Sequence, residues 1–109
     1  MVKLLIKNLK EVEEGARTRA EELIKSKVEF YENLFKKYDK DLTLEVIFDY
    51  SAAVYKVSAS LDLKSKKVLI AEEGKEVLKV VTTLFNEFKK AVKRQYELER
   101  KDYEYKRKR

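Results

Sequence analysis

The chain contains no cysteine, no histidine and no proline, and only two of its 109 residues are glycine. Without cysteine and histidine there are no thiol nucleophiles, no disulfides, none of the usual zinc ligands and no imidazole to act as a general base. We therefore expect no metal site and no cofactor, and we predict that the protein is not an enzyme. Because proline and glycine are so scarce, no linker is indicated, and we expect one domain.

Long apolar runs are also missing. No stretch approaches the roughly 20 apolar residues that a membrane-spanning helix needs. The N-terminal sequence MVKLLIKNLK is too short, and too interrupted by lysine, for a signal peptide. The lack of cysteine fits a reducing compartment. Together these features predict a cytoplasmic protein with no membrane partner.

Charge, by contrast, is abundant: 42% of the residues are charged, and the net charge is +6. Residues 1–88 carry equal numbers of basic and acidic side chains, whereas residues 89–109 carry ten basic and four acidic ones. The whole excess therefore lies in the last fifth of the chain. A local basic excess favours a polyanionic partner such as nucleic acid. A solvated helix face followed by a solubilising tail would give the same count, so charge alone leaves both interpretations open.

Four segments show the apolar–polar alternation or the short apolar run of a β-strand. They are residues 2–7, 42–49, 55–64 and 68–71. The sequence Ser65-Lys66-Lys67 is compatible with a hairpin turn between the last two. Glu72, Glu73 and Gly74 are expected to end the last strand in an acidic turn before a helix, rather than to form an acid–base or metal site.

Two segments show helical periodicity, residues 13–38 and a longer one that begins near Lys75. The apolar stripe of the second helix is Val77, Val81, Leu84, Phe85, Phe88 and Val92. Beyond Tyr96 the stripe weakens, so residues 97–109 are expected to be a charged helix extension or tail that frays unless a partner orders it. Tyr96 is expected to cap the apolar stripe.

The resulting order, β-α-β-β-β-α, predicts an α+β fold in residues 1–96. Three consecutive strands form an antiparallel meander, and the first strand joins through the first helix. The right-handed crossover rule makes that strand parallel to its neighbour. Each helix has one apolar stripe and each strand one apolar face, so we expect a four-stranded mixed sheet with two helices packed on one face.

This order and several local patterns resemble the short form of the bacterial ribosome hibernation promoting factor family, also called ribosome-associated inhibitor A or sigma modulation proteins. The segment YKVSASLDLKSKK is similar to that family's penultimate strand and hairpin. VLIAEEGKEVLKVVTTLFNEFKKAVKR is similar to its last strand, acidic corner and second helix, and KSKVEFYENLFKKY to the end of its first helix.

The resemblance implies a non-enzymatic protein that binds the small ribosomal subunit, through ribosomal RNA, in the channel of messenger and transfer RNA. Such a protein blocks translation and preserves idle ribosomes. The family's separate C-terminal dimerisation domain has no counterpart in the sequence, so we expect a chain that is monomeric when free and does not pair two ribosomes by itself. The rival hypothesis is a protein-interaction module that uses the exposed sheet face or the charged tail and binds no RNA.

The resemblance also points to particular cations. Lys90 and Arg94 fall on basic positions of the family's second helix and Lys27 on one of its first, while Lys93 is an added charge. Three positions depart from the family pattern, because Leu78 replaces an aromatic residue and Glu87 and Phe30 replace lysines.

From periodicity alone, Lys79, Asn86, Lys90 and Lys93 form a polar stripe on the second helix that suits a phosphate backbone. The full set of candidate RNA-binding residues is Lys27, Lys79, Lys89, Lys90, Lys93, Arg94, Arg100 and Lys101. Tyr103 and Tyr105 lie among basic residues, where aromatic rings can stack on bases, although free tail residues would look the same. Lys106 to Arg109 are expected to act as an additional electrostatic aid.

Overall fold

A computed structural model of the protein describes the backbone of residues 1–107 and the side chains of residues 1–101. The elements follow the predicted order. They are β1 (Val2–Lys7), a short 3-10 turn η1 (Leu9–Glu11), α1 (Glu14–Leu34), β2 (Leu42–Ser51), β3 (Val54–Asp62), β4 (Lys67–Gly74) and α2 (Val77–Arg107).

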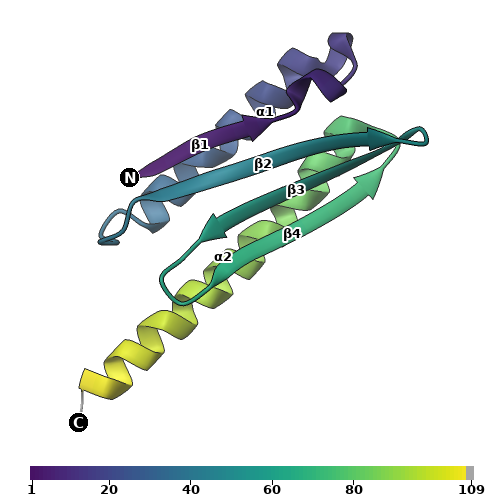
Figure 1. The fold of residues 1–109 in the computed structure, drawn as a ribbon. Helices are drawn as coiled ribbons and strands as arrows, with labels where there is room; N and C mark the ends of the chain where they lie inside the picture. Colours follow the sequence, from purple (N-terminus) through teal and green to yellow (C-terminus); the bar gives the residue numbers. More distant parts are fainter. Residues whose placement is uncertain (108–109) are drawn as a thin grey trace.

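The four strands form one mixed sheet in the order β1-β2-β3-β4. β1 is parallel to β2, which places Leu4 beside Leu44, and the other two pairs are antiparallel. Both helices cover the same face of the sheet and run in roughly the same direction, α1 behind β1 and β2 and α2 behind β3 and β4 (Figure 1). The α+β class and the arrangement predicted from the sequence are therefore confirmed.

The core lies between the sheet and the two helices. All six residues of the stripe predicted for the second helix are buried, and alternate residues of the strands meet them from the sheet. Aromatic rings join the two helices, because Tyr31 packs against Phe88 with ring centroids 5.7 Å apart and Phe35 packs against Tyr96 at 4.8 Å. Tyr96 thus closes one end of the core, as its place after the stripe predicted.

The prediction of an acidic turn at residues 72–74 is wrong, because β4 continues through Gly74. Glu73 lies opposite Lys56 in β3, and Glu72 lies opposite Val57. An opposite charge directly across the ladder stabilises a strand that looks unfavourable when read by itself. At Gly74 a Cβ atom would lie 2.7 Å from Val80 Cγ2, so the end of β4 approaches the start of α2 too closely for a side chain.

The second helix is also longer than its apolar stripe predicts, because α2 continues without a break to Arg107. The reason lies partly in Glu99, whose carboxylate accepts hydrogen bonds from the Tyr38 hydroxyl at 2.6 Å and from the backbone N–H of Ser65 at 3.1 Å. These contacts hold the first turn beyond Tyr96 against the body of the domain. The predictions for Tyr103, Tyr105 and residues 106–109 lie outside the side chains that the structure describes.

The turn between β2 and β3 consists of two alanines, Ala52 and Ala53, with φ angles of 52° and 62°. Positive φ at both central residues is the pattern of a type I′ turn, which fits the twist of a hairpin and normally carries asparagine and glycine. Two Cβ atoms in this conformation make the turn locally strained.

Candidate nucleic-acid interface

A row of cations follows the side of α2 that faces away from the sheet. Lys79, Lys90 and Lys93 are exposed, and successive steps of 100° per residue place them opposite the buried residues Leu84 and Phe88. Asn86 lies in the same row and is exposed as well. We call Lys79, Lys90 and Lys93 the α2 lysine row. The polar stripe predicted from the sequence is therefore solvent-exposed.

Carboxylates lie near two members of the row, because Lys79 shares a groove with Glu72, Glu73 and Glu76 and Lys90 forms an ion pair. Lys90 Nζ lies 3.7 Å from Glu87 Oε1, one turn earlier on the helix, and both side chains are more than half exposed. An exposed pair of this kind is worth little and is easily exchanged for another anion. Within the described residues, Lys79 and Lys93 form no ion pair.

Lys89 of α2 and Lys27 of α1 lie where the two helices meet. Lys89 Nζ stands 4.6 Å from the centre of the Phe30 ring, a cation–π contact between the two helices. Lys27 is partly buried and comes one turn before Phe30 and Tyr31, on the side of α1 turned towards α2. These two lysines therefore mark the seam between the helices, beside the α2 lysine row.

Arg94 is exposed and lies about 40° from Lys90 around the helix axis, on the flank of α2 next to β4. It lines a groove of about 530 Å³ together with Lys66, Lys67 and Leu98. The sequence placed Arg94 with the RNA-binding candidates, but the structure places it at the outer edge of the sheet. It therefore borders the α2 lysine row on the side of β4.

Arg100 and Lys101 extend the basic surface past the end of the core. The Arg100 guanidinium lies 5.8 Å from the centre of the Tyr96 ring, which orients it against the helix. Both side chains are exposed. The candidate cations of α2 thus extend from Lys79 to Lys101, about 33 Å along the axis at the rise of an α-helix.

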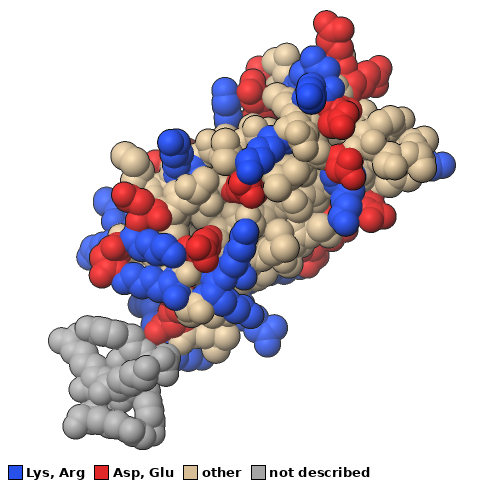
Figure 2. Space-filling model, viewed as in Figure 1, with Lys and Arg blue, Asp and Glu red and all other residues tan. Residues whose placement is uncertain are grey.

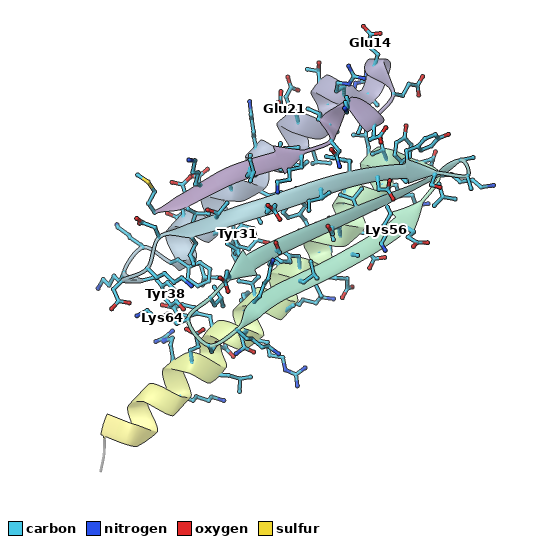
Figure 3. All side chains as sticks on the ribbon, viewed as in Figure 1. Glu14, Glu21, Tyr31, Tyr38, Lys56 and Lys64 are labelled. Atoms are coloured by element: carbon cyan, nitrogen blue, oxygen red, sulfur yellow. The ribbon has the colours of Figure 1, made fainter. Side chains whose placement is uncertain are left out.

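The lysines around the β3–β4 hairpin were not predicted as part of a site. Lys64 Nζ pairs with Asp39 and also lies 5.1 Å from the centre of the Tyr38 ring. Figure 3 shows Tyr38 and Lys64 side by side at this end of the sheet. Lys and Arg side chains gather at the same end in Figure 2, with Asp and Glu among them. The signal in the sequence was the run Lys64 to Lys67, which reads as an ordinary turn.

Hydrogen bonding and burial shift two pKa values in this hairpin network. Burial raises the pKa of Tyr38 to about 12, and the hydrogen bond that its hydroxyl donates to Glu99 adds to the shift. For Glu99, burial acts to raise the pKa, but hydrogen bonds from Ser65 and Tyr38 outweigh it and the pKa is lowered. At neutral pH the network therefore consists of a neutral phenol beside an ionised carboxylate. Its hydrogen bonds hold Tyr38, the β3–β4 hairpin and α2 together.

Two further features bear on the possible classes of site. Within residues 1–101, no three acidic side chains come together in a way that would hold a metal ion. None of the helices in the described part of the chain is both long and apolar enough to cross a membrane.

No family model matches the chain, and no curated protein is significantly similar to it. The candidate interface therefore rests on the fold and on the placement of its cations.

Proposed function

We propose that the protein is a translation inhibitor of the hibernation-factor type, which binds RNA of the small ribosomal subunit and occupies the channel of messenger and transfer RNA. The observation that carries this proposal is the α2 lysine row, a line of exposed cations on a rigid helix with its own buried face anchored in the core. The β-α-β-β-β-α order, with both helices on one sheet face, is the architecture that the resemblance implies.

The mechanism is steric occupancy, with affinity supplied by phosphate contacts. Each lysine or arginine that meets a phosphate releases condensed counterions, so binding weakens steeply as salt rises. The cations are held on an α-helix packed against a sheet, and little conformational entropy remains to be lost in the backbone on binding. Structured RNA is read mainly by its shape, which two parallel helices of fixed spacing can match.

The second helix contributes most of this surface, and the first contributes its edge. Lys27 and Lys89 flank the α2 lysine row at the seam between the helices. Phe30 stands where the family has a lysine, and its ring forms the cation–π contact with Lys89. The positive charge that α1 lacks at this position is therefore offset by Lys89 of α2. The RNA footprint is accordingly centred on α2.

Co-sedimentation with purified small ribosomal subunits tests the proposal. We expect the chain to pellet with the subunits at low salt and to be released as salt rises. The variant K79E/K90E/K93E should remain folded, because all three side chains are exposed, and should stay in the supernatant. A chain that stays in the supernatant at low salt would refute the ribosomal proposal.

A control variant separates the site from net charge. K3E/K10E/K66E makes the same change in charge at three exposed lysines outside the row, none of which forms an ion pair within the described residues. We expect this variant to pellet nearly as well as the unaltered chain. If the two triple variants lose binding equally, the attraction is general and the α2 lysine row is not the site.

A further inference from the structure

The outer edge of β4 is open. β4 is the last strand of the sheet, and no other described strand lies beside it (Figure 1). At the β3–β4 hairpin the Leu63 N–H donates to the Lys66 carbonyl at 3.1 Å, so Lys66 points its backbone groups towards β3. Because backbone groups alternate along an antiparallel strand, Lys67, Leu69, Ala71 and Glu73 point theirs outwards. Four residues thus offer free donors and acceptors at this edge.

The side chains of β4 do not protect this edge in the usual way. The edge strands of natural sheets are usually protected against pairing with another chain by charged side chains within the strand, by proline or by β-bulges. β4 has its charges at the ends, Lys67 at one and Glu73 at the other, and Leu69 between them is 60% exposed. β1, at the opposite edge, carries Lys3 and Lys7 within only six residues. The β4 edge therefore has the composition of a strand that pairs.

We propose that β4 pairs antiparallel with β4 of a second copy of this chain, about a two-fold axis at Ile70. This register joins all four outward residues of each strand in hydrogen-bonded pairs. It sets Lys67 of one copy opposite Glu73 of the other, and Leu69 opposite Ala71. The product is a continuous eight-stranded sheet with the four helices on one face.

Charge complementarity selects this register. Asp49 of β2 lies opposite Lys56 of β3, and Lys56 lies opposite Glu73 of β4. In the second copy, Lys67 lies opposite Asp62. Joining Glu73 to Lys67 of the second copy completes a row of five charges of alternating sign across the sheet. The two-fold axis forms this row twice, and opposite charges directly across a ladder are favourable.

The side of β4 that faces the helices is complementary as well. The groove between β4 and α2 near Leu69 is rimmed by Lys66, Lys67 and Arg94 and has no carboxylate in its lining. At the other end of β4 a second groove, of about 300 Å³, is lined by three glutamates with two lysines, which are Glu72, Glu73, Glu76, Lys75 and Lys79. The two-fold axis sets the basic end of one copy against the acidic end of the other.

A second copy fits this edge better than the chain's own C-terminal segment does. Residues 102–109 carry four basic and two acidic side chains, so the cations at the rim of the groove would repel them. Dimerisation also places Leu69 beside Ala71 of the second copy and brings a neighbour close to Leu98, which is 52% exposed and lines the same groove. The pairing does not depend on RNA binding.

A single introduced cysteine tests the two-fold axis, since the chain has none of its own. Ile70 would face Ile70 of the second copy in a non-hydrogen-bonded pair, with Cα atoms about 4.5 Å apart, within disulfide reach. Mild oxidation of Ile70→Cys should therefore give a covalent dimer in high yield. The control is Lys67→Cys, whose two copies would lie six residues apart along the strands, roughly 20 Å, and should give at least tenfold less dimer.

Charge reversal tests the register by analytical ultracentrifugation of the full chain without RNA. Lys67→Glu and Glu73→Lys should each weaken dimerisation by about tenfold or more, because symmetry introduces each repulsion twice. The double variant K67E/E73K should recover most of the loss. Its new repulsions with Asp62 and Lys56 occur within one chain, so they are equal in monomer and dimer and cancel. Lys3→Glu, at the other edge, should change nothing.

The possible results test the dimer, its register and the proposed function separately. A chain that keeps the mass of one copy up to millimolar concentration overturns the proposal, as does equal cross-linking by the two cysteine variants. A dimer that is indifferent to both single reversals overturns this register. If the dimer forms as described but the chain does not pellet with ribosomal subunits, only the proposed function fails.

Discussion

Glu99 shows how a single carboxylate extends the folded unit. It receives hydrogen bonds from Tyr38, at the end of the α1 region, and from Ser65, in the β3–β4 hairpin. Gln95, one turn earlier on α2, donates to the Ser65 hydroxyl at 2.8 Å. Three separate parts of the chain thus meet at one charged group, and hydrogen bonds to a charged group are stronger than neutral ones.

Replacing Tyr38 by phenylalanine should remove the hydroxyl from this network and lower the free energy of unfolding by about 1–2 kcal/mol near pH 8. Tyr38 donates to Glu99 and accepts from the Lys64 N–H at 2.8 Å, and both bonds would be lost. Urea unfolding measures the change. Tyr50→Phe is the control, because Tyr50 is 46% exposed and its hydroxyl has no hydrogen bond within the described residues.

Tyr38→Phe should also change how the free energy of unfolding depends on pH above about pH 10. The pKa of Tyr38 is raised from 10.0 to about 12 in the folded protein, so folding favours the neutral phenol. This contribution is fully present below about pH 10 and declines as pH rises from there towards 12. Tyr38→Phe should therefore lose less stability than the unaltered chain between about pH 10 and pH 12. Parallel alkaline profiles for the two proteins would contradict this assignment.

The Ala52-Ala53 turn is a site where substitution should stabilise the protein. Both alanines have positive φ, which costs L-residues about 1 kcal/mol or more each. Ala53→Gly should therefore raise the free energy of unfolding by about 1 kcal/mol. Ala71→Gly, at an exposed position within β4, should instead lower it by about 0.5–1 kcal/mol. Thermal unfolding of the two variants should shift in opposite directions, and a shared direction would refute a strained turn.

At the scale of elements, α2 has two parts that are stabilised differently. Up to Val92 the helix is anchored by a continuous buried stripe, and Tyr96 packs on Phe35 and Tyr38. Beyond Tyr96 the anchor is polar and depends on Glu99. The segment from Glu97 to Lys101 therefore belongs to the folded domain even though it has little apolar surface to bury.

Truncation tests this division of α2. A chain that ends after Tyr96 loses Glu99 and should be less stable than the full chain by about 1–3 kcal/mol. A chain that ends after Lys101 keeps the hairpin contacts and should unfold within about 0.5 kcal/mol of the full chain. Chemical denaturation of both truncated chains measures the difference. Equal stability of the two would show that the Glu99 contacts contribute little.

Local periodicity was sufficient to predict the strands and the buried stripe of α2, because each of those patterns arises when one face of a single element packs against the core. It failed where the stabilising partner is distant in sequence. Glu73 reads as a strand breaker until Lys56 is placed opposite it, and the helix past Tyr96 reads as frayed until Tyr38 and Ser65 reach Glu99. Only the first of these is an error, and both cases concern the ends of elements, where tertiary contacts outweigh local propensity.

At the scale of the whole molecule, the same limit applies to the candidate site. Periodicity predicted that Lys79, Lys90 and Lys93 share the polar side of α2, and all three are exposed. It could not predict that Lys89 would meet Phe30 of α1 or that Arg94 would line a groove beside β4. Which neighbour stands at each flank of a helix is decided by the packing of other elements.

The two proposed surfaces lie mainly on different sides of the molecule. The α2 lysine row faces away from the sheet, whereas the pairing edge is the outer side of β4. A dimer formed through β4 would therefore leave Lys90 and Lys93 of each copy exposed, whereas Lys79 also lines the groove at the Glu73 end of β4. The proposed dimer and RNA binding by α2 thus share Lys79 among the residues of the row.

The salt dependence of binding to small ribosomal subunits tests the central claim most directly. Each phosphate contact adds about 0.7–0.9 to the slope of log affinity against log salt concentration. If the α2 lysine row contacts RNA, K79E/K90E/K93E should bind more weakly and with a slope reduced by about 2 to 3, whereas K3E/K10E/K66E should keep the slope of the unaltered chain. Equal slopes for the unaltered chain and K79E/K90E/K93E would show that the row does not meet the phosphates.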